Sequence, residues 1–245
     1  MKAEPAVQRR LLELAKVDAE LSRLAHRRRT LPELTEIAEL EKELQAKKDA
    51  LVSVQTNASD LDREVARQER EIDSVRTRTD KDRKAMESGA VGAKQLTELQ
   101  HELESLQRRQ TALEDDLLEL MERREALDLD AQRTGAEVDK VTGQLENAVR
   151  RRDEAFADID TTQARREQDR AELAPKFPEP LTKLYERVRA QRGIGAALLR
   201  SRRCGSCHLD LDRSTVSEIK TMPEDEIVQC ENCNAILVRT MESGL

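Results

Sequence analysis

The sequence has no tryptophan, one tyrosine and two phenylalanines, so aromatic residues make up only 1% of its 245 positions. Charged residues make up 38% and hydrophobic residues 37%. This profile is typical of a long helix or coiled coil and argues against a globular enzyme with one large core. The class that we expect is mainly α.

Long apolar runs are also missing. No stretch of about 18 apolar residues is present to cross a membrane, and the N-terminus has no apolar signal segment. We therefore expect a cytoplasmic protein without a membrane partner. In that compartment four cysteines indicate metal binding or redox chemistry, not structural disulfides. The net charge of −7 gives no general reason to expect nucleic acid.

Apolar residues recur every seven positions over most of the chain, which is the pattern of a coiled-coil seam. The first arm contains Ile37, Leu44, Leu51, Ala58, Val65 and Ile72. The second arm contains Leu99, Leu106, Leu113, Leu120, Leu127 and Val141. The breakers Ser88–Gly92 lie between arms of nearly equal length, 6–86 and 93–173. The sequence therefore predicts an antiparallel coiled-coil helical hairpin over residues 1–174, with its tip near 82–93.

Two features interrupt this pattern. Thr30-Leu31-Pro32-Glu33 predicts a kink near 30–33, with Thr30 as the N-cap of the helix that follows. We hypothesise that this kink acts as a hinge. Gln68 and Gln110 fall in the seam and would face each other as a polar layer if the hairpin is symmetric about residues 89 and 90. The alternative is that such side chains reach toward solvent.

Residues 79–84, next to the tip, are densely charged and have no apolar seam. We therefore expect the first arm to fray before it reaches Gly89. The candidate partner-binding residues around the tip are Arg83, Lys84, Lys94, Gln100 and His101. His101 has no companion that would make a metal or catalytic site. The alternative is an ordinary solvent-facing histidine.

Two C-x2-C motifs carry the chemistry. Cys204 and Cys207 form the first, and Cys230 and Cys233 form the second, 22 residues further along the chain. This spacing predicts a zinc ribbon, in which four thiolates hold one structural Zn²⁺ ion in a closed tetrahedron. Asn234 is expected to adopt positive φ after the second motif. His208 also follows a ligand, but four cysteines leave no coordination position for it.

Residues 175–245 form the second predicted domain, a linker helix followed by the ribbon. Three prolines between 175 and 180 end the second arm, and Leu181, Leu184, Tyr185 and Val188 predict a short helix. A strand is expected after Gly195, and further strands around the second C-x2-C motif. The three aromatic residues are expected to pack this domain onto the base of the hairpin.

A basic stripe follows the prolines, with only Glu186 as an acidic residue inside it. Its members are Lys183, Arg187, Arg189, Arg192, Arg200, Arg202 and Arg203. Such a stripe is a candidate nucleic-acid-binding surface. The alternative is that it pairs with acidic residues of the ribbon or of the hairpin base. No aromatic residues are interleaved with it for base stacking.

The motifs together resemble a bacterial family with an N-terminal coiled-coil hairpin and a C-terminal four-cysteine zinc ribbon, which includes a flagellar regulator and a chlamydial protein that binds a sigma factor. The resemblance rests on Leu99-Gln100-His101-Glu102, on Leu184-Tyr185, and on the two C-x2-C motifs with Ile236-Leu237. It implies that the four cysteines hold the metal and that the chain is an adaptor for proteins and, in some members, RNA. Asn234 departs from the glycine usual in the family.

Three functional classes follow. The first is a non-enzymatic adaptor or scaffold that binds protein partners through the tip, the ribbon or both. The alternative is a protein that binds RNA or DNA through the basic stripe, and the third class is a passive spacer or oligomerising rod. No set of residues typical of an active site is present, so we do not expect an enzyme. A heptad seam alone is compatible with a monomer or a dimer.

Overall fold

The computed structural model describes residues 1–89 and 92–245, and Ala90 and Val91 of the expected tip lie outside this part of the chain. Two compact units make up the chain: unit 1 contains residues 1–34 and 150–245, and unit 2 contains residues 35–149. The expected domain boundary near residue 174 lies within unit 1. None of the helices in the described ranges has the length and hydropathy needed to cross a membrane.

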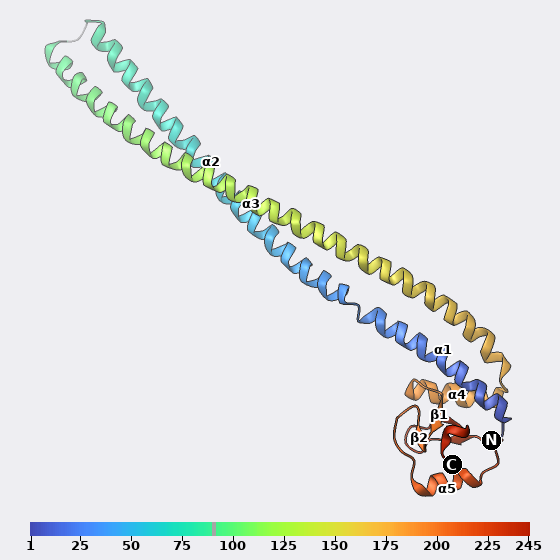
Figure 1. The fold of residues 1–245 in the computed structure, drawn as a ribbon. Coiled ribbons are helices and arrows are strands. Elements are labelled where there is room, and N and C mark those ends of the chain that lie inside the picture. The colour runs from blue at the N-terminus through green and yellow to red at the C-terminus, as the bar shows by residue number, and fades with distance from the viewer. Residues whose placement is uncertain (90–91) are drawn as a thin grey trace. The chain divides into compact units, whose positions relative to one another are not determined.

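Unit 2 is an antiparallel helical hairpin, as the heptads predict. Its arms belong to helix α2, Pro32–Glu87, and helix α3, Ala93–Leu173, which lie side by side (Figure 1). The seam residues of α2 are its most buried ones, including Ile37, Leu44 and Ile72. Segment 79–84 stays helical, so the first arm continues to Glu87 and the expected fraying is not observed. Asp82 is buried there and accepts a hydrogen bond from Arg78 at 3.0 Å.

The register of the hairpin differs from the symmetric one that the sequence suggested. Gln68 donates to the backbone oxygen of Leu113 at 3.1 Å, and Gln110 donates to Glu114 on its own helix at 2.9 Å. The expected layer of two facing glutamines is therefore wrong. That expectation assumed a hairpin that is symmetric about residues 89 and 90. In the structure Gln68 meets Leu113 instead of Gln110, so the pairing is shifted by a few residues along α3.

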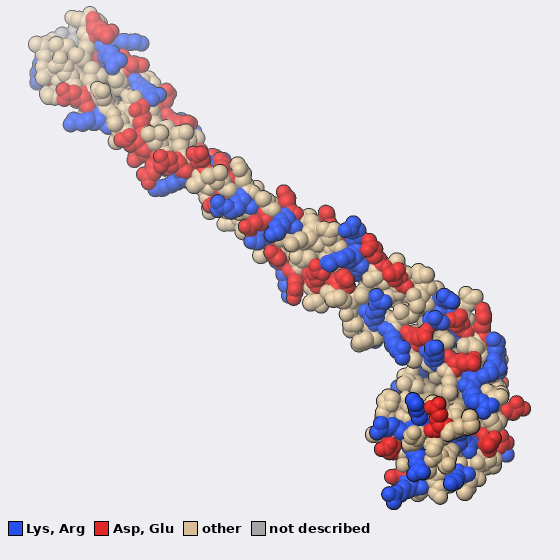
Figure 2. Space-filling view, viewed as in Figure 1, with Lys and Arg blue, Asp and Glu red and all other residues tan. Residues whose placement is uncertain are grey.

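Charged residues in the seam find partners on the opposite arm. Lys47 forms an ion pair with Glu137 at 2.5 Å, and Arg124 forms one with Asp62 at 2.6 Å. Their long side chains leave the apolar row and end at carboxylates on the surface. Acidic and basic side chains are interspersed over the face shown in Figure 2.

Unit 1 begins with helix α1, Pro5–Arg29, and the break between α1 and α2 falls at residues 30 and 31. Thr30 belongs to the end of α1, because its backbone N–H and its hydroxyl both donate to the carbonyl of His26. The expectation that Thr30 caps the next helix is therefore wrong. Pro32 is the first residue of α2. Its missing N–H costs no hydrogen bond there, because N–H groups in the first turn of a helix have no acceptor within the helix.

The ribbon is a four-stranded sheet with the strand order β2-β1-β4-β3. The strands are β1 Ala196–Arg200, β2 Arg203–Cys204, β3 Val228–Gln229 and β4 Ile236–Val238. Strands β1 and β4 are parallel, and the other two pairings are antiparallel. Short helices and turns complete the unit: η1 Ala174–Lys176, α4 Glu179–Arg192, α5 Arg213–Thr221 and η2 Met241–Ser243.

Successive side chains of the sheet point to opposite faces. Ala196 and Ile236 pack with Leu11 and Leu14 of α1 and with Tyr185 of α4. Leu199 and Leu237 instead pack with the cysteines and with Ile219 of α5. The sheet therefore separates a helical core from the metal site.

The N-terminal residues form part of the ribbon. Ala3 donates its N–H to the backbone oxygen of Asp225 at 2.7 Å, and Ile227 donates to the oxygen of Met1 at 2.9 Å. Gln8 is buried and its amide donates to the oxygens of Ala3 and Glu224. These bonds attach the start of α1 to the segment before β3.

A buried carboxylate joins three helices of unit 1. Asp18 of α1 is 1% exposed and accepts hydrogen bonds at 2.7 Å from Arg170 of α3 and from the hydroxyl of Tyr185 of α4. Arg189 of α4 lies 3.2 Å from the same carboxylate. Burial, together with the bond to Asp18, raises the pKa of the Tyr185 phenol, so it remains a donor at neutral pH. Two arginines compensate the desolvated charge of Asp18.

Candidate metal centre

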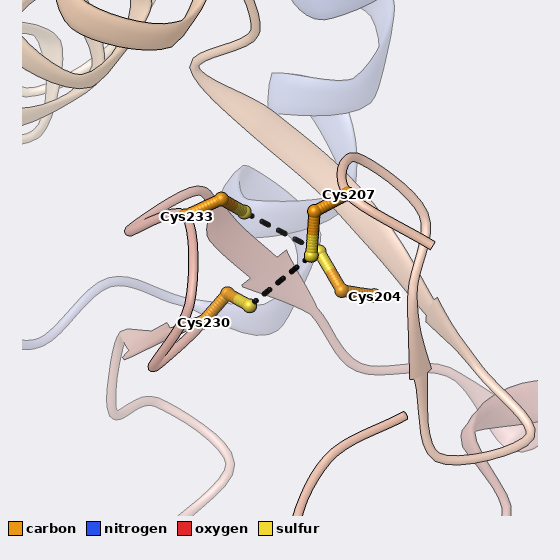
Figure 3. A group of neighbouring side chains, drawn as sticks. All are labelled: Cys204, Cys207, Cys230 and Cys233. Carbon is orange, nitrogen blue, oxygen red and sulfur yellow. Dashed lines mark hydrogen bonds between the residues drawn. The ribbon is translucent and has the colours of Figure 1, made fainter. Parts of the chain in front are cut away.

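The four cysteines converge on one point, although 22 residues separate the two motifs (Figure 3). Their sulfur atoms all lie within 4.8 Å of one another. The Sγ atoms of Cys204 and Cys233 are 3.7 Å apart, and those of Cys207 and Cys230 are 3.8 Å apart. A tetrahedron with metal–sulfur bonds of about 2.3 Å has edges of about 3.8 Å, so the spacing fits a four-coordinate Zn²⁺ ion.

The two motifs have the same backbone geometry. In the first, His208 donates its N–H to the oxygen of Cys204 at 2.9 Å and has φ +59°. In the second, Asn234 donates to the oxygen of Cys230 at 2.8 Å and has φ +62°. The positive φ expected for Asn234 is thus present, and His208 occupies the equivalent position. The side chain of His208 is exposed, and its backbone N–H closes the turn that contains Cys204 and Cys207.

Three thiols of this cluster, those of Cys204, Cys230 and Cys233, have pKa values shifted in different directions. Burial raises the pKa of Cys204 to about 12 and also raises the pKa of Cys230. For Cys233 burial acts against ionisation, but the N–H of Ala235 and the neighbouring thiols stabilise its thiolate and hold its pKa at about 7. Four thiolates this close together need a cation, which a bound metal supplies. The backbone N–H of Ser206, 3.4 Å from the sulfur of Cys204, is a donor suited to a metal-bound thiolate.

Helix α5, which sequence reasoning missed, supports the second motif. Its first turn is tied to Glu231, which accepts hydrogen bonds from the N–H of Asp212 at 3.1 Å and from the hydroxyl of Thr215 at 2.7 Å. Ile219 packs in the core that surrounds the cysteines. The sequence carries only a short signal for this helix: Val216 and Ile219 are three residues apart, and Pro223 follows them.

The basic stripe is largely paired within unit 1. Its ion pairs are Lys183–Glu179 at 2.6 Å, Arg189–Asp18 at 3.2 Å, Arg200–Glu242 at 3.2 Å and Arg203–Asp210 at 3.2 Å. Arg202 donates to the backbone oxygen of Gly244. Arg187 and Arg192 are exposed on α4. Most of the stripe is thus bonded to acidic residues or backbone of its own unit, which is the alternative that the sequence left open.

The tip candidates all lie on the surface. Lys94 and His101 are seven residues apart on α3 and share a face, and Gln100 shares another face with Leu96. Leu96 is exposed, although it belongs to an apolar heptad row. On α2, Arg83 is 4.0 Å from Asp80, and Lys84 is exposed. These residues border the tip and do not form an enclosed site.

The fold and the cysteine cluster define a class: a coiled-coil helical hairpin joined to a C4-type zinc ribbon that holds one zinc ion. Residues 14–193 match the CT398-like coiled coil hairpin domain, and residues 203–237 match the C4-type zinc ribbon domain. The chain therefore belongs to the family of the CT398-like coiled-coil hairpin, as the resemblance in its motifs implied.

Relatives and solved structures agree with this assignment. An uncharacterized protein of Mycobacterium tuberculosis is 45% identical over 239 residues, which cover 98% of each chain. A structure from Mycobacterium smegmatis has 43% identity and a TM-score of 0.89, and the match covers 98% of this chain and 100% of that one. CT398 from Chlamydia trachomatis, at 16% identity and a TM-score of 0.69 over 95% and 97% of the two chains, shares the fold.

Proposed function

We propose that this protein is a non-enzymatic adaptor that binds protein partners through the tip of the hairpin, the zinc ribbon or both. The observation that carries the proposal is the surface next to the tip, where Leu96 and Gln100 share one exposed face of α3 and Lys94 and His101 share another. Leu96, which is 37% exposed, adds an apolar side chain to this otherwise polar surface. The basic stripe supports nucleic-acid binding less well, because most of its charge is paired.

The experiment compares partners recovered from the native host by tagged wild-type protein and by the double variant Gln100→Ala/His101→Ala. Partners are identified by mass spectrometry, with and without nuclease treatment. We expect a protein partner that survives nuclease and whose recovery falls about tenfold in the variant, which corresponds to about 1.4 kcal/mol of binding free energy. His26→Ala is the matched control, because His26 is also an exposed helical histidine but lies in unit 1.

One result would contradict binding through the tip and leave the ribbon as the binding surface, and another would contradict the adaptor proposal as a whole. Equal recovery of every partner by wild type and double variant would remove the tip from the binding surface. Loss of all partners on nuclease treatment would instead favour nucleic-acid binding by the basic stripe. In that case binding should also weaken steeply as the salt concentration rises.

A further inference from the structure

A groove of about 490 Å³ lies between the two arms of unit 2 and is lined by residues of α2 and α3 that do not belong to the tip. Ile72 of α2 is buried in it, Leu117 of α3 is half-buried, and Leu118 of α3 lies at its edge with 60% of its surface exposed. Met121, one turn further along α3, is 52% exposed. These two large apolar side chains are directed to solvent on a helix whose own seam is already filled by α2.

The residues around the groove continue the spacing of a coiled-coil seam. Glu114, Leu118, Met121 and Glu125 follow one another at intervals of four, three and four residues along α3. Side chains at this spacing lie in one row on a helix. The row is separate from the seam row that contains Leu113, Leu117 and Leu120. Helix α3 therefore carries a second row that can pack against another helix.

The charge around this row is strongly negative. Residues 111–130 contain eight acidic residues and two arginines, and residues 60–76 of α2 contain six acidic residues and four arginines. Their net charge of −8 is more negative than that of the whole chain, −7. Within the described ranges no ion pair involves Glu69, Asp73, Glu122 or Glu125, whereas Glu114 is paired with Arg76 at 2.5 Å.

We propose that this groove binds a basic amphipathic helix of a partner protein. The apolar residues of that helix pack on Leu118 and Met121, and its Lys and Arg side chains lie against Glu69, Asp73 and Glu125. An amphipathic helix in a groove is a common mode of peptide recognition. A second copy of this groove is a poor occupant, because two strongly acidic surfaces repel each other. The surface is distinct from the tip and the ribbon, so it goes beyond the adaptor surfaces proposed above.

The test uses the full-length, zinc-loaded protein and a labelled 21-residue synthetic peptide with Leu at the a and d heptad positions and Lys at e and g. A scrambled peptide of the same composition keeps the charge but loses the apolar row. We expect the heptad peptide to bind about tenfold more tightly than the scrambled one in fluorescence anisotropy at physiological salt. The double variant Leu118→Gln/Met121→Gln, which keeps the net charge, should abolish that difference.

The matched control is Val52→Gln, because Val52 is 59% exposed on α2 and does not line the groove. This variant should bind the peptide as the wild type does. The variant Gln100→Ala/His101→Ala should also bind it normally, so the groove and the tip can fail independently.

Three outcomes overturn the proposal. They are absence of binding, equal affinity for the heptad and scrambled peptides, and unchanged affinity of Leu118→Gln/Met121→Gln. Sedimentation of the wild-type chain as a dimer that Leu118→Gln/Met121→Gln converts to a monomer would show that a second copy covers the groove, which also overturns it.

Discussion

The two units of this protein bury their side chains in different ways. The largest fully buried side chains, among them Tyr185, Leu11 and Leu14, all belong to unit 1. In unit 2 most seam residues of α3 are half-buried, because a two-helix seam covers each side chain from one direction only. A substitution in unit 2 should therefore have a local and modest effect, whereas one in unit 1 disturbs a core that several elements share.

Loss of the metal should show the largest contrast between the units. The substitution Cys204→Ser removes one of four ligands, and structural zinc contributes roughly 10–16 kcal/mol to folding in zinc-finger peptides. We expect loss of bound zinc by elemental mass spectrometry and loss of structure in the ribbon. The helical circular dichroism of the hairpin should largely remain. Ser206→Ala, between the same two cysteines, should keep the metal, and equal zinc content in both variants would contradict the assignment.

The buried carboxylate of unit 1, Asp18, should show the next largest effect. Asp18→Asn removes the negative charge that compensates Arg170 and Arg189 and should cost about 3–5 kcal/mol. The measurement is urea unfolding followed by the fluorescence of Tyr185, the only tyrosine in a chain without tryptophan. Asp160→Asn removes an exposed ion pair with Arg28 in the same unit and should cost less than about 1 kcal/mol. Similar costs for both variants would show that burial of Asp18 has little effect.

Glycine-to-alanine substitutions should have opposite signs in the two units. In unit 1, a Cβ on Gly195 would lie 2.6 Å from the ring of Tyr185, so Gly195→Ala should destabilise by about 1–3 kcal/mol. In unit 2, a Cβ on Gly143 meets nothing within 4 Å, so Gly143→Ala should stabilise α3 by about 1 kcal/mol. Urea unfolding, followed by Tyr185 fluorescence for the first and circular dichroism for the second, measures both. Stabilisation by Gly195→Ala would contradict the close packing on Tyr185.

The smallest effect should come from an exposed pair across the hairpin. The hydrogen bond from Lys47 and its charge lower the pKa of Glu137. A lowered folded-state pKa means that the stabilisation is present above the ordinary carboxyl pKa of about 4.3 and is lost as the pH falls through the lowered value. The difference in melting temperature between wild type and Glu137→Gln should therefore be small at pH 7 and vanish in acid. A difference that persists at low pH would show that the pair does not cause it.

Repeating patterns made the architecture predictable. The heptad residues from Ile37 to Val141 determine the two arms, and the prolines after Leu173 end α3 where the sequence indicated. The two C-x2-C motifs predicted the metal site, because four cysteines at this spacing match the ligand set of a zinc ribbon. The positive φ of Asn234 followed from its place in the turn.

Features that depend on contacts between distant residues were not predictable. Met1 and Ala3 pair with a segment more than 220 residues away, and nothing in their sequence marks them as a strand. The partner of Gln68 on the other arm is the backbone oxygen of Leu113. A hairpin assumed to be symmetric about residues 89 and 90 instead places Gln110 opposite Gln68. Nothing in the sequence around Asp18 marks it as buried, because its burial depends on Tyr185 and Arg170, which lie more than 150 residues away in the chain.

The division of unit 1 into residues 1–34 and 150–245 has a consequence for synthesis on the ribosome. Unit 2 is continuous in sequence, so its two arms can associate as soon as the second has emerged. The segment that holds Leu11, Leu14 and Asp18 must wait for β4 and α4, which are made about 10–40 s later at ordinary elongation rates. During that interval the apolar face that packs on β4 and α4 lacks these two partners, so we expect this segment of the nascent protein to be a target for chaperones.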